Sequence, residues 1–154
     1  MRYAEAKKGR IFILRLEDGE ILQEQIEKFA RKNKIHSAEV RLLGGVDKGS
    51  KLIVGPKEGR SATIEPMMHI LDEMHEAIGS GTIFLNEENV PKLHCHIVCG
   101  RENRVVCGEI REGVIVWHIM EVILTELLHC NAIRKKDNKT GFELLIPGKD
   151  FDSE

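Results

Sequence analysis

Two histidines that lie two positions apart, His94 and His96, are the residues of this sequence best placed to do chemistry. The β-branched, apolar run that follows them indicates a strand. Side chains alternate between the faces of a strand, so both imidazoles would point the same way, about 7 Å apart. Neutral imidazole is a common ligand of zinc and related metals. The pair predicts one side of a metal site, although two solvated histidines would give the same pattern.

A third ligand is expected on the strand that follows. A polar turn separates the two strands, and if it centres on residues 102–103, antiparallel pairing sets Glu109 opposite His96 and diagonal to His94. Such neighbours lie about 5 Å and about 7–8 Å apart. Cys107 would share this face, whereas a one-residue slip would turn both side chains away. We therefore predict a divalent metal at His94, His96 and Glu109, and the chemistry of these donors favours zinc.

Three further groups bear on this site. His75 and Glu76 precede a strand that should pair with the histidine strand, so either could supply a fourth ligand or a proton-transfer group. His118 lies in an apolar run after Trp117, which is typical of a core or interface histidine. The sequence leaves open whether His75, Cys107 or His118 joins the metal.

Composition narrows the class of protein. A chain of 154 residues with 42% hydrophobic and 31% charged residues fits one globular domain. A net charge of −2 is unlike the basic imbalance of a dedicated nucleic-acid binder, so any DNA binding should be weak. No apolar stretch reaches the roughly 18 residues of a membrane span, and the N-terminus lacks a signal peptide's apolar region. Four cysteines without a CxxC pair suggest reduced thiols in the cytoplasm.

The sequence predicts that most of the elements that position these groups are strands. An amphipathic helix is expected after Asp18, its N-cap, and up to about Asn33. The stretch 65–76 is ambiguous, because its methionines and Leu71 fit a helical stripe that would pack in the core. Strands are expected over residues 11–16, 37–43, 51–55, 61–65, 78–85, 93–99, 105–110, 114–128 and 142–146.

The resulting prediction is a single α+β domain, with a mainly antiparallel sheet and one principal helix. One helix covers only one face of such a sheet, so copies of the chain are expected to cover the other. The predicted organisation is an N-terminal segment at residues 1–10, the domain at residues 11–147 and an acidic tail at residues 148–154.

Short motifs run along the chain: Arg15-Leu16-x-x-Gly19-Glu20-x-Leu22, Phe29-Ala30, Ile35, Ala38-x-Val40, Gly44-x-Val46, Gly81-Thr82-Ile83, His94-x-His96, Gly108-x-Ile110-x-x-Gly113 and Glu121-Val122. Their order and spacing resemble the plants-and-prokaryotes conserved (PPC) domain over about residues 11–147. The resemblance implies a homotrimer. It also implies a DNA-binding or regulatory role, because stand-alone prokaryotic members are commonly described in this way.

The sequence departs from the family pattern in two places. It lacks the Arg-Gly-Arg-Pro core of the AT-hook, which enters the minor groove and precedes the domain in plants. Many members carry a third histidine where this chain has Glu109. The domain is also distantly similar to acetolactate decarboxylase, a zinc enzyme with a His-x-His strand. That similarity implies an alternative function, a zinc-dependent enzyme acting on a small carbonyl or hydroxy-acid substrate.

Overall fold

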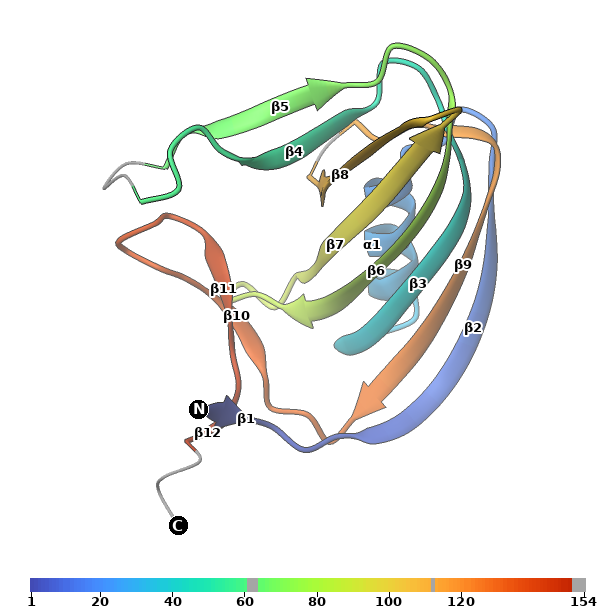
Figure 1. Ribbon diagram of the computed structural model, residues 1–154. Coiled ribbons are helices and arrows are strands. Elements are labelled where there is room, and N and C mark those ends of the chain that lie inside the picture. The colour runs from blue at the N-terminus through green and yellow to red at the C-terminus, as the bar shows by residue number, and fades with distance from the viewer. Residues whose placement is uncertain (61–63, 112, 151–154) are drawn as a thin grey trace.

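The computed structural model describes residues 1–60, 64–111 and 113–150, which form one helix and twelve strands (Figure 1). Eight of the strands form one antiparallel sheet in the order β2-β9-β3-β6-β7-β8-β4-β5. This confirms a mainly antiparallel α+β domain with one principal helix. The elements are β1 (Arg2–Tyr3), β2 (Lys7–Glu17), α1 (Leu22–Lys32), β3 (Ser37–Val46), β4 (Lys51–Pro56), β5 (Pro66–Ile70), β6 (His75–Leu85), β7 (Pro91–Arg101), β8 (Arg104–Ile110), β9 (Val116–Leu128), β10 (Ile133–Lys136), β11 (Glu143–Ile146) and β12 (Lys149–Asp150).

Helix α1 covers one face of the curved sheet (Figure 1). Its buried stripe, Leu22, Ile26 and Ala30, packs into the same core as Cys95 and Ile97 of β7. Burying a leucine or isoleucine side chain contributes about 1.5–3 kcal/mol, so this stripe fixes the helix on the sheet. No helix in the described ranges has the length and apolar character that a membrane crossing requires.

The predicted N-cap is wrong. The helix begins at Leu22, with Ile21 in the N-cap position and no side chain capping it. Gly19 adopts a left-handed conformation (φ 79°), so the chain turns before the helix and carries Asp18 away from its end. Asp18 instead accepts a hydrogen bond from the backbone N–H of His118 at 2.6 Å.

The face of the sheet opposite α1, hereafter the open face, carries exposed apolar side chains. Ile13 of β2 pairs with Ile123 of β9, and Leu43, Ile78 and Val98 pair in turn across β3, β6 and β7. All five side chains are exposed in the isolated chain, and Ile78 is 66% exposed. The chain therefore leaves this face uncovered around Ile78, as its single helix predicts.

Residues 65–76, which are ambiguous in the sequence, contain strands rather than a helix, although Leu71 of the predicted stripe does lie in the core. Met67 and Met68 lie on strand β5 and are exposed. Residues 66–70 pair with β4, and this pairing outweighs the helical preference of methionine. The strand expected at 61–65 falls partly outside the described residues, since 61–63 are not described, and the strand that forms begins only at Pro66.

The C-terminal region contains more structure than predicted. The expected strand at 142–146 forms as β11, and it pairs with a strand that was not predicted, β10. Strand β12 pairs with β1 and joins the two ends of the chain, so residues 149–150 are not frayed (Figure 1). The rest of the predicted tail, residues 151–154, lies outside the described part of the chain, as does Glu112 of the predicted turn.

Candidate functional site

The hairpin of β7 and β8 places the predicted ligands together. Arg101 pairs with Arg104 across the turn, and the register that follows sets His96 opposite Glu109. On the other side of β7, Thr82 of β6 lies opposite His94. The predicted pairing of Glu109 with His96 is thus confirmed, and all four side chains lie on the open face.

Gly81, on the strand next to the histidine strand, allows the two strands to lie at their observed spacing. Gly81 of β6 pairs with Cys95, and a Cβ atom at position 81 would lie 2.5 Å from the carbonyl oxygen of His94 and 2.6 Å from Cys95 Cβ. Any side chain here would push β7 away from β6. Gly81 therefore sets the position of the histidine strand, a role that becomes visible only once the strand order is known.

His94 and Glu109 are in direct contact. His94 Nδ1 lies 3.3 Å from Glu109 Oε1, and the rings of His94 and His96 are 5.1 Å apart between centroids. Arg111 Nη2 donates a hydrogen bond of 2.9 Å to the other carboxylate oxygen, Oε2. The hydrogen bond with His94, helped by the charge of Arg111, lowers the pKa of Glu109 although burial opposes this. Glu109 is therefore an ionised carboxylate at neutral pH.

These contacts differ from a formed metal centre. Within residues 1–60, 64–111 and 113–150, no group of three or more His, Cys, Asp or Glu side chains is arranged to hold a metal ion as it stands. The reason is visible at Glu109, whose two oxygens face His94 and Arg111 rather than a shared empty point. The structure brings the three predicted residues to one place, and their role as ligands stays a prediction.

Two of the other candidate groups lie elsewhere. His75 is on the core face of β6, is only 4% exposed, and its Nδ1 lies 2.8 Å from the carbonyl oxygen of Glu73. His75 therefore points away from the candidate ligands, because odd positions of β6 face the core. Glu76 shares the open face but is four positions from Ser80, which faces His96, or about 13 Å along the strand.

His118 is not a core residue. It is exposed and lies at φ 62° where the pairing of β3 with β9 is interrupted by a bulge. The bulge interrupts the alternation of buried and exposed side chains along β9, so His118 faces solvent instead of the core. His118 is far along the sheet order from β7 and β8.

The cysteines contribute no formed ligand. All four are free, and burial raises the pKa of both Cys95 and Cys99 to about 12, so these thiols stay protonated. Cys99 is a small buried residue, whereas Cys130 is only half-buried. Cys107 shares the face of Glu109 as predicted, but it pairs with Val98, two positions away from the histidine contact.

A groove of about 840 Å³ opens above these side chains. Its lining residues come from β6, β7 and β8, from β4, β5 and the β10–β11 hairpin, and from Gln23 of α1. The polar and charged residues that line it are Gln23, Thr82, Lys92, His94, His96, Glu109, Arg111, Arg134 and Glu143. The candidate ligands thus lie in a concave site with room for a small molecule.

Arg134 of β10 is a site residue that sequence reasoning missed. It is only 5% exposed, and its Nη2 donates a hydrogen bond of 2.9 Å to Thr82 Oγ1. Its guanidinium carbon lies 5.8 Å from the ring centroid of Phe84. Burial lowers the pKa of Arg134, since a charged group is poorly solvated there. In the sequence Arg134 precedes two lysines and resembles any solvated basic run.

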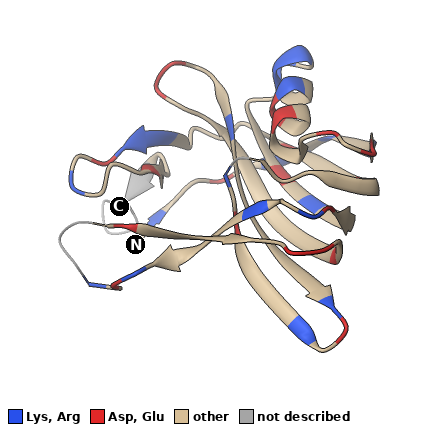
Figure 2. Cartoon of the chain, turned by 90° about the horizontal axis from the view of Figure 1, so that it is seen from above, with Lys and Arg blue, Asp and Glu red and all other residues tan. Residues whose placement is uncertain are grey.

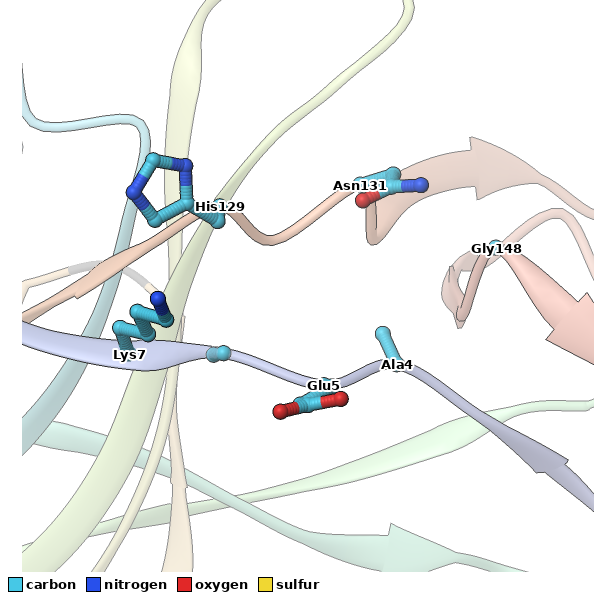
Figure 3. Close-up of a pocket in the computed structure, with 7 residues that line it drawn as sticks. Ala4, Glu5, Lys7, His129, Asn131 and Gly148 are labelled. Atoms are coloured by element: carbon cyan, nitrogen blue, oxygen red, sulfur yellow. The ribbon is translucent and has the colours of Figure 1, made fainter.

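A second, smaller pocket of about 380 Å³ lies where the N-terminal segment meets the end of β9 (Figure 3). Figure 3 shows Glu5 and Lys7 on one side, with His129 and Asn131 on the other. None of the predicted metal ligands lines this pocket. The three predicted ligands therefore line the groove and not this pocket.

Comparison with solved structures gives close matches in fold. The metal-containing protein AF0104 of Archaeoglobus fulgidus is 27% identical with a TM-score of 0.80, over 95% of this chain and 99% of that one. A PPC protein of Pyrococcus horikoshii is 26% identical with a TM-score of 0.81, over 97% and 100%. A candidate DNA-binding protein of Bacteroides thetaiotaomicron shares the fold at 17% identity, with a TM-score of 0.75 over 95% and 99%.

Comparison of the sequence with protein families gives the same family as the solved structures. Comparison with curated proteins gives no significant match. The model of the Plants and Prokaryotes Conserved (PCC) domain matches residues 3–128, which is most of the chain and includes both strands of the His94, His96 and Glu109 hairpin. The chain therefore belongs to the plants-and-prokaryotes conserved domain family.

Proposed function

We propose that this protein is a metal-binding PPC protein in which His94, His96 and Glu109 hold one divalent cation. The observation that carries the proposal is the position of Glu109, opposite His96 and 3.3 Å from His94 Nδ1. Two imidazole nitrogens and a carboxylate oxygen are a donor set that suits zinc. The Archaeoglobus relative, 27% identical, is described as metal-containing, which supports the proposal.

The surroundings of the three residues also fit a cation. Arg111 binds Glu109 Oε2 and so orients the carboxylate with Oε1 directed at His94, in the way that outer contacts orient metal ligands. His94 is 50% exposed and faces the groove, so an outside ligand has access. Three protein ligands and one accessible position are typical of catalytic zinc, and this favours the zinc-enzyme alternative over a purely structural ion.

Metal analysis of protein purified without a histidine tag tests the proposal. After incubation with zinc and desalting, we expect about one zinc ion per wild-type chain, and at least a tenfold loss of affinity in His94→Ala and in Glu109→Ala. His36→Ala is the matched control, because His36 is exposed and lies outside the groove. Less than about 0.1 ion per wild-type chain, or equal metal content in His94→Ala, would contradict the site.

We further propose that the protein assembles as a homotrimer through the open face. Leu43, Ile78 and Val98 form an exposed apolar row there, and Ile13 and Ile123 form an apolar pair beside it, next to Arg41 and Glu121. Exposed apolar patches mark interfaces between proteins. The three-fold symmetry comes from the family resemblance. Copies of the chain would supply the cover that a single helix does not provide.

DNA binding is the second candidate function. The Bacteroides neighbour is described as a candidate DNA-binding protein, but the charge of this chain limits the affinity that we expect. The net charge is −2, and Figure 2 shows both basic and acidic residues on the helix and on the strands. The electrostatic attraction that supplies non-specific DNA affinity is therefore small.

We expect weak and salt-dependent binding to duplex DNA. With about two phosphate contacts, raising salt from 50 to 200 mM should reduce the affinity roughly tenfold, because the contacts release counterions. Fluorescence anisotropy with a labelled duplex measures both the affinity and its slope. An affinity that does not change with salt would rule out direct DNA binding.

A further inference from the structure

Arg134 is a buried cation without a carboxylate partner. Within the described residues, no carboxylate oxygen lies within 4.0 Å of its guanidinium, and its one hydrogen bond goes to the hydroxyl of Thr82. Glu109 and Glu143 act on it only through longer-range attraction. Its Nε has no acceptor at all in the described part of the chain. A buried guanidinium normally pairs with an anion, so Arg134 has unused capacity to bind one.

The position of Arg134 links it to the candidate metal ligands. Thr82, which accepts its hydrogen bond, lies directly opposite His94 across β6 and β7. Directly opposed residues of an antiparallel pair lie about 5 Å apart. The guanidinium and the imidazole are therefore near neighbours in the groove, close enough for one small molecule to contact both.

A second buried polar atom in the groove also has no partner. The side-chain oxygen of Gln23 receives no hydrogen bond in the described residues, while its nitrogen donates to Glu27 at 3.1 Å. Gln23 and Arg134 hold the only two such atoms found in these ranges, and both residues line the same groove. The groove thus offers a cation for an acid group and an acceptor for a hydroxyl or other donor.

We propose that the groove binds a small hydroxy carboxylic acid, whose carboxylate accepts hydrogen bonds from Arg134. This deepens the proposed function, because an oxygen of the same molecule would take the accessible position on the cation at His94, His96 and Glu109. The contact with Arg134 does not require the cation. The acid has only a few carbon atoms, since its two ends must fit between neighbouring strands.

Calorimetric titration with three 2-hydroxy acids, glycolate, lactate and malate, tests the inference. At least one acid should bind the wild type, and propane-1,2-diol, which is lactate without its carboxylate, should bind about tenfold more weakly or worse. Arg134→Gln keeps a donor for Thr82 but removes the charge, and it should weaken binding of the acid about tenfold or more, with or without zinc. Arg104→Gln is the matched control, because Arg104 is an exposed arginine that pairs with Asp72 outside the groove.

Thermal unfolding without ligand is the control that shows whether each variant is folded. Arg134→Gln should not lower the midpoint, since it removes a buried charge that has no partner. Failure of all three acids to bind the wild type, or equal affinity in Arg134→Gln, would overturn the inference. Tighter Arg134-dependent binding of inorganic phosphate than of any acid would also overturn it in favour of a phosphate ligand.

The two proposals fail in distinguishable ways. Arg134-dependent binding of an acid to a wild-type chain that takes up no zinc would support the groove and overturn the metal site. Zinc bound at one ion per chain, with acid binding unaffected by Arg134→Gln, would support the metal site and overturn the groove. A carboxylate of a second copy seated on Arg134 in a crystal structure would also overturn the proposed ligand.

Discussion

Replacing Ile78 with lysine is expected to convert the proposed trimer into monomers of 17.5 kDa. Ile78 lies on β6 between Leu43 on β3 and Val98 on β7, in the middle of the apolar row on the open face. In the proposed trimer this row is buried, and a lysine there would bring an unpaired ammonium out of water, which is costly. In the isolated chain position 78 is exposed, so the fold itself should tolerate the change.

Light scattering at micromolar concentration measures the effect. The wild type should have about three times the mass of one chain, and Ile78→Val, which keeps the face apolar, should keep that mass. Circular dichroism of Ile78→Lys should match the wild type and so show that the monomer is folded. A wild-type mass of 17.5 kDa, or an intact trimer in Ile78→Lys, would contradict assembly through this face.

The part of the site that could be predicted is the part that is local in the sequence. His96 and Glu109 are joined by a hairpin whose turn chemistry fixes the register, so their pairing follows from the position of the turn. The alternation of strand side chains then places His94 on the same face. No knowledge of the rest of the fold is needed for either step.

The residues that were missed or misplaced depend on contacts between distant segments. Arg134 differs from its neighbouring lysines only because β10 pairs with β11 and packs near β6, which is far away in the sequence. His75 is a candidate from sequence because its strand pairs with the histidine strand, but its side chain lies on the other face. In both cases local sequence identifies a strand, whereas the tertiary packing decides which side chain enters the groove.

Gly44 illustrates the same limit in the folding of the sheet. Gly44-Gly45 was interpreted as the end of a strand, but β3 continues to Val46 through a bulge, where the pairing partner on β9 changes from Met120 to Trp117. Gly44 has φ 149°, a conformation that side chains rarely adopt. The bulge therefore keeps two central strands paired at a point where the sequence indicates a break.

Replacing Gly44 with alanine should cost about 3 kcal/mol or more, a large part of the 5–15 kcal/mol that stabilises a typical domain. The new Cβ would lie 2.4 Å from the carbonyl oxygen of Ile119 and 2.8 Å from the Cα of Met120. Both contacts are with the backbone of a central strand, which cannot move aside as a flexible side chain does. We expect the midpoint of urea unfolding to fall sharply, with loss of soluble protein if the wild type is only marginally stable.

Gly19→Ala separates the effect of the clash from that of the backbone conformation. Gly19 also has a positive φ, 79°, but a Cβ there would meet nothing within 4 Å. Only the conformational cost of about 1–2 kcal/mol should therefore appear in this variant. Equal losses of stability in Gly44→Ala and Gly19→Ala would show that the close approach of β9 contributes nothing, and that the bulge relaxes to admit a side chain.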